Sequence, residues 1–201
     1  MNASSQPALN LSEQKDELQV RLVSSRDRFL ASLAGIPDDL SRICPADDNW
    51  SVLECAEHVA VAERGMFSAL EKRQATDAAP DKSKDALIQA FALKRTQKLP
   101  APERAHPKGR FSTLADAVDD FRFARERTLA YLQDINEDLR TSTAVHPLGT
   151  FDSYQLVLIM ALHAERHALQ VEEIKNSLAY RNAIKNSLAY RNAEEQRANH
   201  P

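Results

Sequence analysis

The stretch LVLIMALHAERHALQVEEI, residues 156–174, has the apolar content of a helix at the centre of a protein, yet it carries His163, His167 and Gln170. Polar side chains in an apolar core cost free energy unless a partner satisfies them. The stretch therefore predicts a core helix, and it also predicts that the two imidazoles have a partner inside the protein.

A helical wheel puts the three polar residues within the apolar stripe of this helix. With His163 at zero, His167 lies at about +40° and Gln170 at about −20°. The apolar Leu156 and Ile174 both lie at about +20°, between them. The two histidine Cβ atoms are roughly 6 Å apart, close enough for both rings to bind one metal ion. The alternative is a pair of hydrogen-bonded core histidines, and Gln170 either orients His167 or is a buried amide.

A third candidate ligand is His58, which lies at the edge of the apolar face of the helix that begins at WSVLE, residues 50–54. One helical turn offers only two ligands, so a three-histidine site needs a second helix. Three protein ligands with one open position are typical of a catalytic metal site, whereas structural zinc sites are closed with four. We therefore predict that His58, His163 and His167 bind a divalent metal ion, with zinc, nickel and iron all compatible with imidazole.

The other candidate side chains are given simpler interpretations. His106 and His146 stand in proline-bearing loops and are expected at the surface. Glu57 and Glu165 adjoin the histidines in sequence but point elsewhere on their wheels, so we expect them to be solvated. Cys55 lies on an apolar face and is interpreted as a small core residue.

Apolar residues at helical spacing predict four long amphipathic helices. Two of the helix starts carry a capping pair, Ser51 with Glu54 and Asp152 with Gln155. Between the second and third helices lies a crossover over residues 77–112, with one helix expected at 82–98 and then a stretch rich in proline. This order predicts an all-α four-helix bundle with a long crossover that shapes a pocket. The four helices are expected at residues 12–34, 51–76, 114–135 and from 152 onward.

The composition argues against a nucleic-acid-binding protein and against a membrane protein. The chain has 201 residues, a net charge of −3 and no block of basic residues, so we expect one domain and no nucleic-acid partner. No apolar run approaches the length of about 18 residues that a membrane span needs. With two cysteines and no apolar N-terminal signal, we expect a cytoplasmic protein that does not bind membranes.

The two ends of the chain differ from its centre. Residues 1–11 are polar and are expected to be flexible, residues 12–175 to form the bundle domain, and residues 176–201 to form a C-terminal extension. The decapeptide IKNSLAYRNA occurs at 174–183 and again at 184–193, which indicates a tandem duplication. Its first copy is expected to continue the last helix, and its second to be exposed or to contact another chain.

Several of these features together resemble the DinB/YfiT-like superfamily. The first is WSVLECAEH at 50–58 with the later Glu63, and the second is MALHAERHALQVEEI at 160–174. The crossover and HPLGTF, residues 146–151, also fit in order and separation. The resemblance implies a bundle of up-down-down-up topology and a divalent metal ion bound by His58, His163 and His167.

The resemblance also implies what such a site does. Members of the superfamily are often homodimers, and some are transferases that join low-molecular-weight thiols to electrophiles. We therefore expect a metal-dependent S-transferase, in which a thiol ionises at the open metal position. A hydrolase that uses water at the same position is the first alternative. A metal- or ligand-binding stress protein without catalysis is the second.

Overall fold

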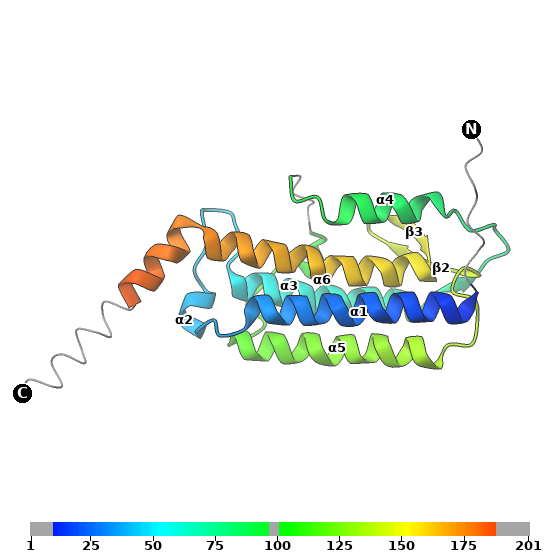
Figure 1. Cartoon of the computed structure of the whole chain (residues 1–201), viewed down its shortest axis with the longest axis horizontal. Coiled ribbons are helices and arrows are strands. Elements are labelled where there is room, and N and C mark those ends of the chain that lie inside the picture. Colours follow the sequence, from blue (N-terminus) through cyan, green and yellow to red (C-terminus); the bar gives the residue numbers. More distant parts are fainter. Residues whose placement is uncertain (1–9, 97–100, 188–201) are drawn as a thin grey trace, which may run out of the picture.

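The computed structural model describes residues 10–96 and 101–187. Four long helices dominate this part of the chain, and shorter elements lie between them (Figure 1). The long helices are α1 (Leu11–Leu33), α3 (Val52–Glu71), α5 (Leu114–Asp134) and α6 (Ser153–Asn176). The shorter elements are α2 (Asp38–Ser41), β1 (Gln74–Ala75), α4 (Ser83–Ala92), η1 (Glu103–Ala105), β2 (Ser142–His146) and β3 (Gly149–Asp152).

Each long helix begins with a capping box, in which the N-cap side chain and the third helical residue satisfy each other's backbone N–H groups. The boxes at Ser51 and Asp152 confirm the two helix starts predicted from the sequence. The box at Asn10 starts α1 at Leu11, one residue earlier than expected, so residues 10 and 11 form the cap and the start of the first helix. Residues 1–9 of the predicted flexible segment lie outside the described residues.

Contacts between helices fix their relative directions. Between α1 and α6, Glu17 contacts Tyr154 and Arg28 contacts Glu165. Between α3 and α5, Arg64 contacts Asp120 and Glu71 contacts Arg127. Between α1 and α5, Lys15 contacts Gln133 and Arg26 contacts Glu126. Residue numbers rise together in the first two pairs and run oppositely in the third. Thus α1 and α6 run one way and α3 and α5 the other (Figure 1).

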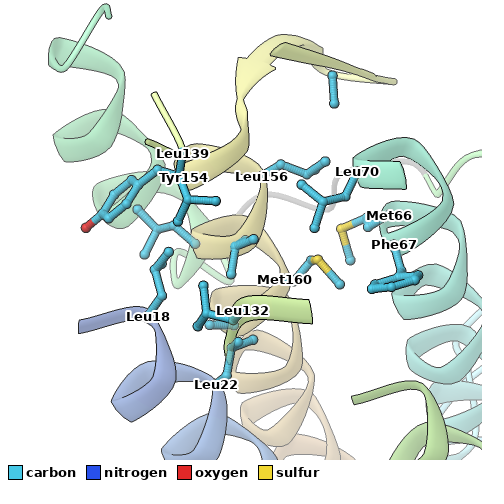
Figure 2. Packing of buried hydrophobic residues seen from close by; sticks show 14 of the residues in the cluster. Leu18, Leu22, Met66, Phe67, Leu70, Leu132, Leu139, Tyr154, Leu156 and Met160 are labelled. Atoms are coloured by element: carbon cyan, nitrogen blue, oxygen red, sulfur yellow. The ribbon is translucent and has the colours of Figure 1, made fainter. Parts of the chain in front are cut away.

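Buried apolar side chains form two clusters, one toward each end of the bundle. Figure 2 shows the first, in which Leu18 and Leu22 of α1 meet Leu132 of α5 and Met160 of α6. The second contains Phe29 and Phe121 in edge-to-face contact, with ring centroids 5.1 Å apart. Fully burying one such large apolar side chain contributes roughly 1.5–3 kcal/mol, so these clusters are the main stabilising feature of the fold.

The segment 141–151, expected to be a loop, instead forms a β-hairpin. Strands β2 and β3 pair antiparallel, with Ala144 opposite Phe151 and His146 opposite Gly149, and β1 extends the sheet. Residues 142–145 and 150–151 include threonine, valine and phenylalanine, which favour strands, but the run is too short for a clear alternation. The pairing of β1 with β2 also explains why α3 ends at Glu71 and not near residue 76.

The crossover folds back over the bundle, as expected, but its helix is shorter than predicted. Helix α4 ends at Ala92, whereas a helix was expected over residues 82–98, of which 97 and 98 lie outside the described residues. None of the residues of α4 is buried, so packing does not extend the helix further. After it, the chain carries η1 and a turn that reaches the start of α3. Within the described residues, no helix combines the length and apolar character needed to cross a membrane.

The C-terminal extension begins with a break in the last helix. α6 ends at Asn176, Ser177 is extended, and residues 178–187 are helical again (Figure 1). In the first copy of the repeat, Tyr180 is buried against the second core cluster, while Leu178 is exposed. The first copy therefore spans the break, because residues 174–176 end α6 and residues 178–183 belong to the next helical stretch. Leu188 and Tyr190 of the second copy lie outside the described residues.

Candidate metal centre

Two antiparallel helices bring His58, His163 and His167 together. His58 comes from the second turn of α3, and the other two come from the middle of α6, one turn apart. One ring nitrogen of each histidine lies within 4.8 Å of the other two, and the Nε2 atoms of His58 and His163 are 3.1 Å apart. The wheel predicted that these rings face the interior, and the fold brings all three to one place.

The spacing of these nitrogens suits a shared metal ion. Two imidazoles bound to zinc at about 2.0–2.1 Å in tetrahedral geometry have nitrogens roughly 3.3 Å apart. The contact between His58 and His163 is close to that value. Because the ligands are three neutral nitrogens from two helices, the donor set fits a borderline divalent ion such as zinc, nickel or iron.

The orientation of His58 is set by the crossover. Its Nδ1 lies 2.8 Å from the carbonyl oxygen of Ala105, the last residue of η1. A carbonyl can only accept, so Nδ1 carries the proton and donates it, and the lone pair is left on Nε2. A hydrogen bond on the far nitrogen of a metal-binding histidine is the usual way in which its ring is oriented.

His167 has different neighbours. Its Nδ1 is 3.5 Å from the Sγ of Cys55, a fully buried cysteine of α3. A side-chain hydrogen bond with Gln170 acts to raise the pKa of His167. The Oε1 of Gln170 also accepts a hydrogen bond from Arg95, at 3.3 Å. Gln170 is partly buried and lies within hydrogen-bond reach of His167, as the first of its two expected roles requires.

Burial favours the neutral form of all three histidines. It lowers the pKa of His58, partly offset by the hydrogen bond to Ala105, and lowers the pKa values of His163 and His167 well below their usual range. The mutual proximity of the rings lowers the latter two further. Neutral imidazoles have the free lone pairs that metal binding requires. The Nδ1 of His163 is buried and has no hydrogen-bond partner among the described residues.

Trp50, directly before the N-cap of α3, forms a wall beside the three histidines. Its ring lies 4.7 Å from that of His58 and 5.6 Å from that of His106, measured between centroids. We did not single out Trp50 from the sequence. The sequence does place Trp50 directly before the capping box of the helix that carries His58, and this position could have indicated a residue of the site.

The histidines line a cavity of about 760 Å³ between α3, α6 and the crossover. Its wall also includes His106 and His146, which were expected only at the surface. His106 is exposed and His146 is partly buried, and both turn toward this cavity because the η1 loop and the β-hairpin close its sides. The volume is within the range of about 300–1,000 Å³ that is usual for small-molecule sites.

Glu57 was expected to be solvated, and that prediction was wrong. It is 1% exposed, and its carboxylate accepts hydrogen bonds from the backbone N–H groups of residues 108, 109 and 110. The Arg110 guanidinium also donates to it, at 2.5 Å. Burial would raise the pKa of Glu57, but these hydrogen bonds more than offset it and lower the pKa. Glu57 thus holds the turn that follows Ala105. Glu165, in contrast, pairs with Arg28 at the surface.

Comparisons with known proteins agree with this architecture. A family model described as the DinB superfamily matches residues 21–171. Among solved structures, the chain is similar to YfiT from Bacillus subtilis, with a TM-score of 0.54 and 11% sequence identity, over 87% of this chain and 92% of that one. That protein is described as a probable metal-dependent hydrolase with an unusual four-helix bundle topology. Curated protein sequences give no match.

Proposed function

The chain belongs to the DinB superfamily, and on that premise we propose that it is a metal-dependent hydrolase of small molecules. The ion would be held by His58, His163 and His167. The observation that carries the proposal is the convergence of three neutral, largely buried imidazoles on the wall of a cavity. Three protein ligands leave a coordination position open to that cavity. The description of YfiT as a probable metal-dependent hydrolase supports the same reaction.

The ion would supply Lewis acidity at its open position, which activates a small molecule held there. The chain's own residues prepare that position. Ala105 fixes the tautomer of His58, so that Nε2 faces the other two rings. The Trp50 ring lies against those of His58 and His167 and forms one side of the position. Burial raises the pKa of Cys55 to about 12, so its thiol stays protonated and is no nucleophile at neutral pH.

Transfer of a low-molecular-weight thiol, the reaction expected first from the sequence, is the second candidate. The size of the cavity supports this reaction, because a volume of about 760 Å³ has room for a thiol beside an electrophile. It would use the same three histidines and the same open position. The non-catalytic alternative, a binding protein, uses the site without turnover.

Metal analysis of purified protein tests the site first. Wild type should carry about one divalent ion per chain, and His58→Ala, His163→Ala and His167→Ala should each lose most of it. His106→Ala is the matched control, because this histidine lines the same cavity but lies outside the triad. A wild type without metal, or triad variants with unaltered metal content, would overturn the proposal.

Turnover separates the three candidate functions. Metal-loaded, chelator-treated and metal-resupplied protein should be assayed on a panel of small esters and amides, with and without cysteine or glutathione. Hydrolysis that needs the metal but no thiol supports the hydrolase. Products that contain the added thiol support the transferase. A metal-loaded protein that turns over none of the panel, with or without thiols, favours the binding protein.

A further inference from the structure

The cavity carries more positive than negative charge, although the chain as a whole has a net charge of −3. Among the described residues that line it, Arg95, Arg104 and Arg166 are cationic, while Asp48 and Glu173 are anionic. Three positive and two negative groups leave a surplus of one positive charge. A surplus of one sign of charge in a cavity favours ligands of the opposite sign.

One of the two carboxylates is already neutralised. The Arg95 guanidinium donates to both carboxylate oxygens of Glu173, with Nε 3.0 Å from Oε1 and Nη2 2.6 Å from Oε2. Such a two-pronged pair is among the stronger ion pairs in proteins. Glu173 is therefore compensated mainly by Arg95, although its charge also acts to raise the pKa of Arg166.

Arg104 offers its charge to the cavity directly. It lies in η1, is exposed, and its guanidinium makes no hydrogen bond or ion pair with any described residue. Its effect reaches across the cavity to the β-hairpin. Burial lowers the pKa of His146, and the positive charge of Arg104 lowers it further. A guanidinium of this kind can turn toward an incoming anion without breaking another contact.

Arg166 carries a second positive charge at the level of the histidines. It is 8% exposed, and its Nη1 donates to the carbonyl oxygens of Ala92 and Lys94, at 3.0 and 2.5 Å. Burial and the nearby Arg95 lower its pKa, and the charge of Glu173 partly offsets them. Like charges held together at a partly buried site cost free energy, and a bound anion offsets that cost.

The remaining wall of the cavity is apolar. Val61 and Met66 of α3 face Ile159 of α6, and Leu148 at the tip of the β-hairpin adds a side chain that is 64% exposed. Ile159 is one turn before His163 on α6, so the apolar wall adjoins the candidate metal centre directly. A ligand that fills this space needs an apolar body as well as an anionic group.

We propose that the cavity binds a small amphipathic anion, whose carboxylate or phosphate is held by Arg104 and Arg166 and whose apolar body lies against Met66, Ile159 and Leu148. The proposal rests on the proposed function, since it describes the substrate class of the same site. It adds that the substrate must carry a negative charge, which the three histidines alone do not require. Such a ligand lies beside His163 when it is bound.

Titration calorimetry with matched probes tests the proposal. Zinc-loaded protein is titrated with hexanoate, hexyl phosphate and hexanamide, and its metal content is measured in the same samples. At least one anion should bind about tenfold or more tightly than the neutral amide, because a hydrogen bond to a charged group is stronger than one to a neutral group. The two anions distinguish a carboxylate from a phosphate as the preferred group.

The Arg104→Gln variant separates binding by the arginine from binding by the metal. It should weaken the binding of the preferred anion about tenfold while leaving hexanamide binding and metal content unchanged. Arg28→Gln is the control, because Arg28 is an exposed arginine outside the cavity. Equal affinities for anion and amide, or an Arg104→Gln variant that binds the anion like wild type, would overturn the inference. In either case, one zinc ion per chain leaves the proposed function standing. Conversely, protein that binds no zinc but still prefers the anion would support the inference and overturn the proposed function.

Discussion

At the scale of single residues, Glu57 connects the crossover to the candidate metal centre. Its carboxylate gathers the N–H groups of residues 108–110, and the same turn presents the carbonyl of Ala105 to His58. A glutamine in its place has the same size but only one carbonyl oxygen, and its NH₂ group would face backbone donors. Through this chain of contacts, Glu57 is a positioning residue for His58.

We predict that Glu57→Gln lowers the free energy of unfolding by about 1–3 kcal/mol, because buried donors lose their acceptor. Metal affinity should fall roughly tenfold, as is usual when a partner that orients a metal ligand is removed. Competition with a chelator measures the affinity, and urea unfolding measures the stability. Glu165→Gln, which changes a surface ion pair, should alter neither by much. A Glu57→Gln variant with wild-type metal affinity would show that the turn does not position His58.

The two cysteines should differ sharply in reactivity. Cys44 is exposed, whereas Cys55 is fully buried and burial raises its thiol pKa to about 12. In native protein, a chromogenic disulfide reagent should therefore modify one thiol per chain, and the second only after unfolding. Cys44→Ser should remove the fast reaction. Two thiols that react at the same rate in the native state would contradict the burial of Cys55.

Residues that act through their own helix were predictable from the sequence, and residues that act through a distant loop were not. His163 and His167 stand out because a wheel needs only the helix that carries them. Glu57 was misjudged because its partners come from residues 108–110, about fifty positions away, and only the fold brings them together. The tautomer of His58 depends on Ala105 for the same reason.

At the scale of elements, the start of α6 decides how accurately His163 and His167 are positioned. Asp152 caps this helix in a reciprocal pair with Gln155, is 6% exposed, and accepts a hydrogen bond from Arg140 at 2.9 Å. It is also the last residue of β3, so the hairpin and the helix meet at one side chain. Loss of this carboxylate removes a helix cap and a buried ion pair together.

Asp152→Ala should lower the free energy of unfolding by about 2 kcal/mol or more, from the lost cap and the lost partner of Arg140. Asn10→Ala removes the cap of α1 at an exposed position and should cost only about 0.5–1 kcal/mol. Urea unfolding of both variants beside wild type measures the difference. Equal losses would mean that the buried ion pair at Asp152 adds nothing to the cap.

Helix starts were the most predictable elements, because a capping box is a local signal of four residues. The hairpin at 142–152 was missed because its short strands show no clear alternation, and it is stabilised by pairing with β1 and packing on α6. The end of α4 was also misplaced. After Leu93 the chain continues with Lys94, Arg95 and Thr96, so no apolar face favours a longer helix there.

At the scale of the whole molecule, one buried ion pair ties the four long helices together. Arg125 of α5 is fully buried and donates to both carboxylate oxygens of Glu63 in α3, at 2.7 and 3.0 Å. It also donates to the carbonyl oxygens of Leu22 in α1 and Met160 in α6. Glu63 belongs to the family-like motif in the sequence, but its partner on another helix could be identified only from the fold.

Removing one member of this pair leaves the other buried without its partner. Arg125→Met should therefore lower the free energy of unfolding by about 3–5 kcal/mol. The double variant Glu63→Leu/Arg125→Met should recover much of that loss, since both buried charges are gone. Arg64→Met, which breaks an exposed pair with Asp120 between the same two helices, should cost less than about 1 kcal/mol. A double variant less stable than either single variant would contradict this account.

The central claim is that three histidines from two antiparallel helices bind one divalent ion. Anomalous diffraction from crystals of the metal-loaded protein, collected at the absorption edge of the metal, tests it most directly. We predict one strong peak per chain within about 2.0–2.2 Å of a ring nitrogen of His58, His163 and His167. A fully loaded protein whose peak lies away from these three rings, or that shows no peak between them, would contradict the claim.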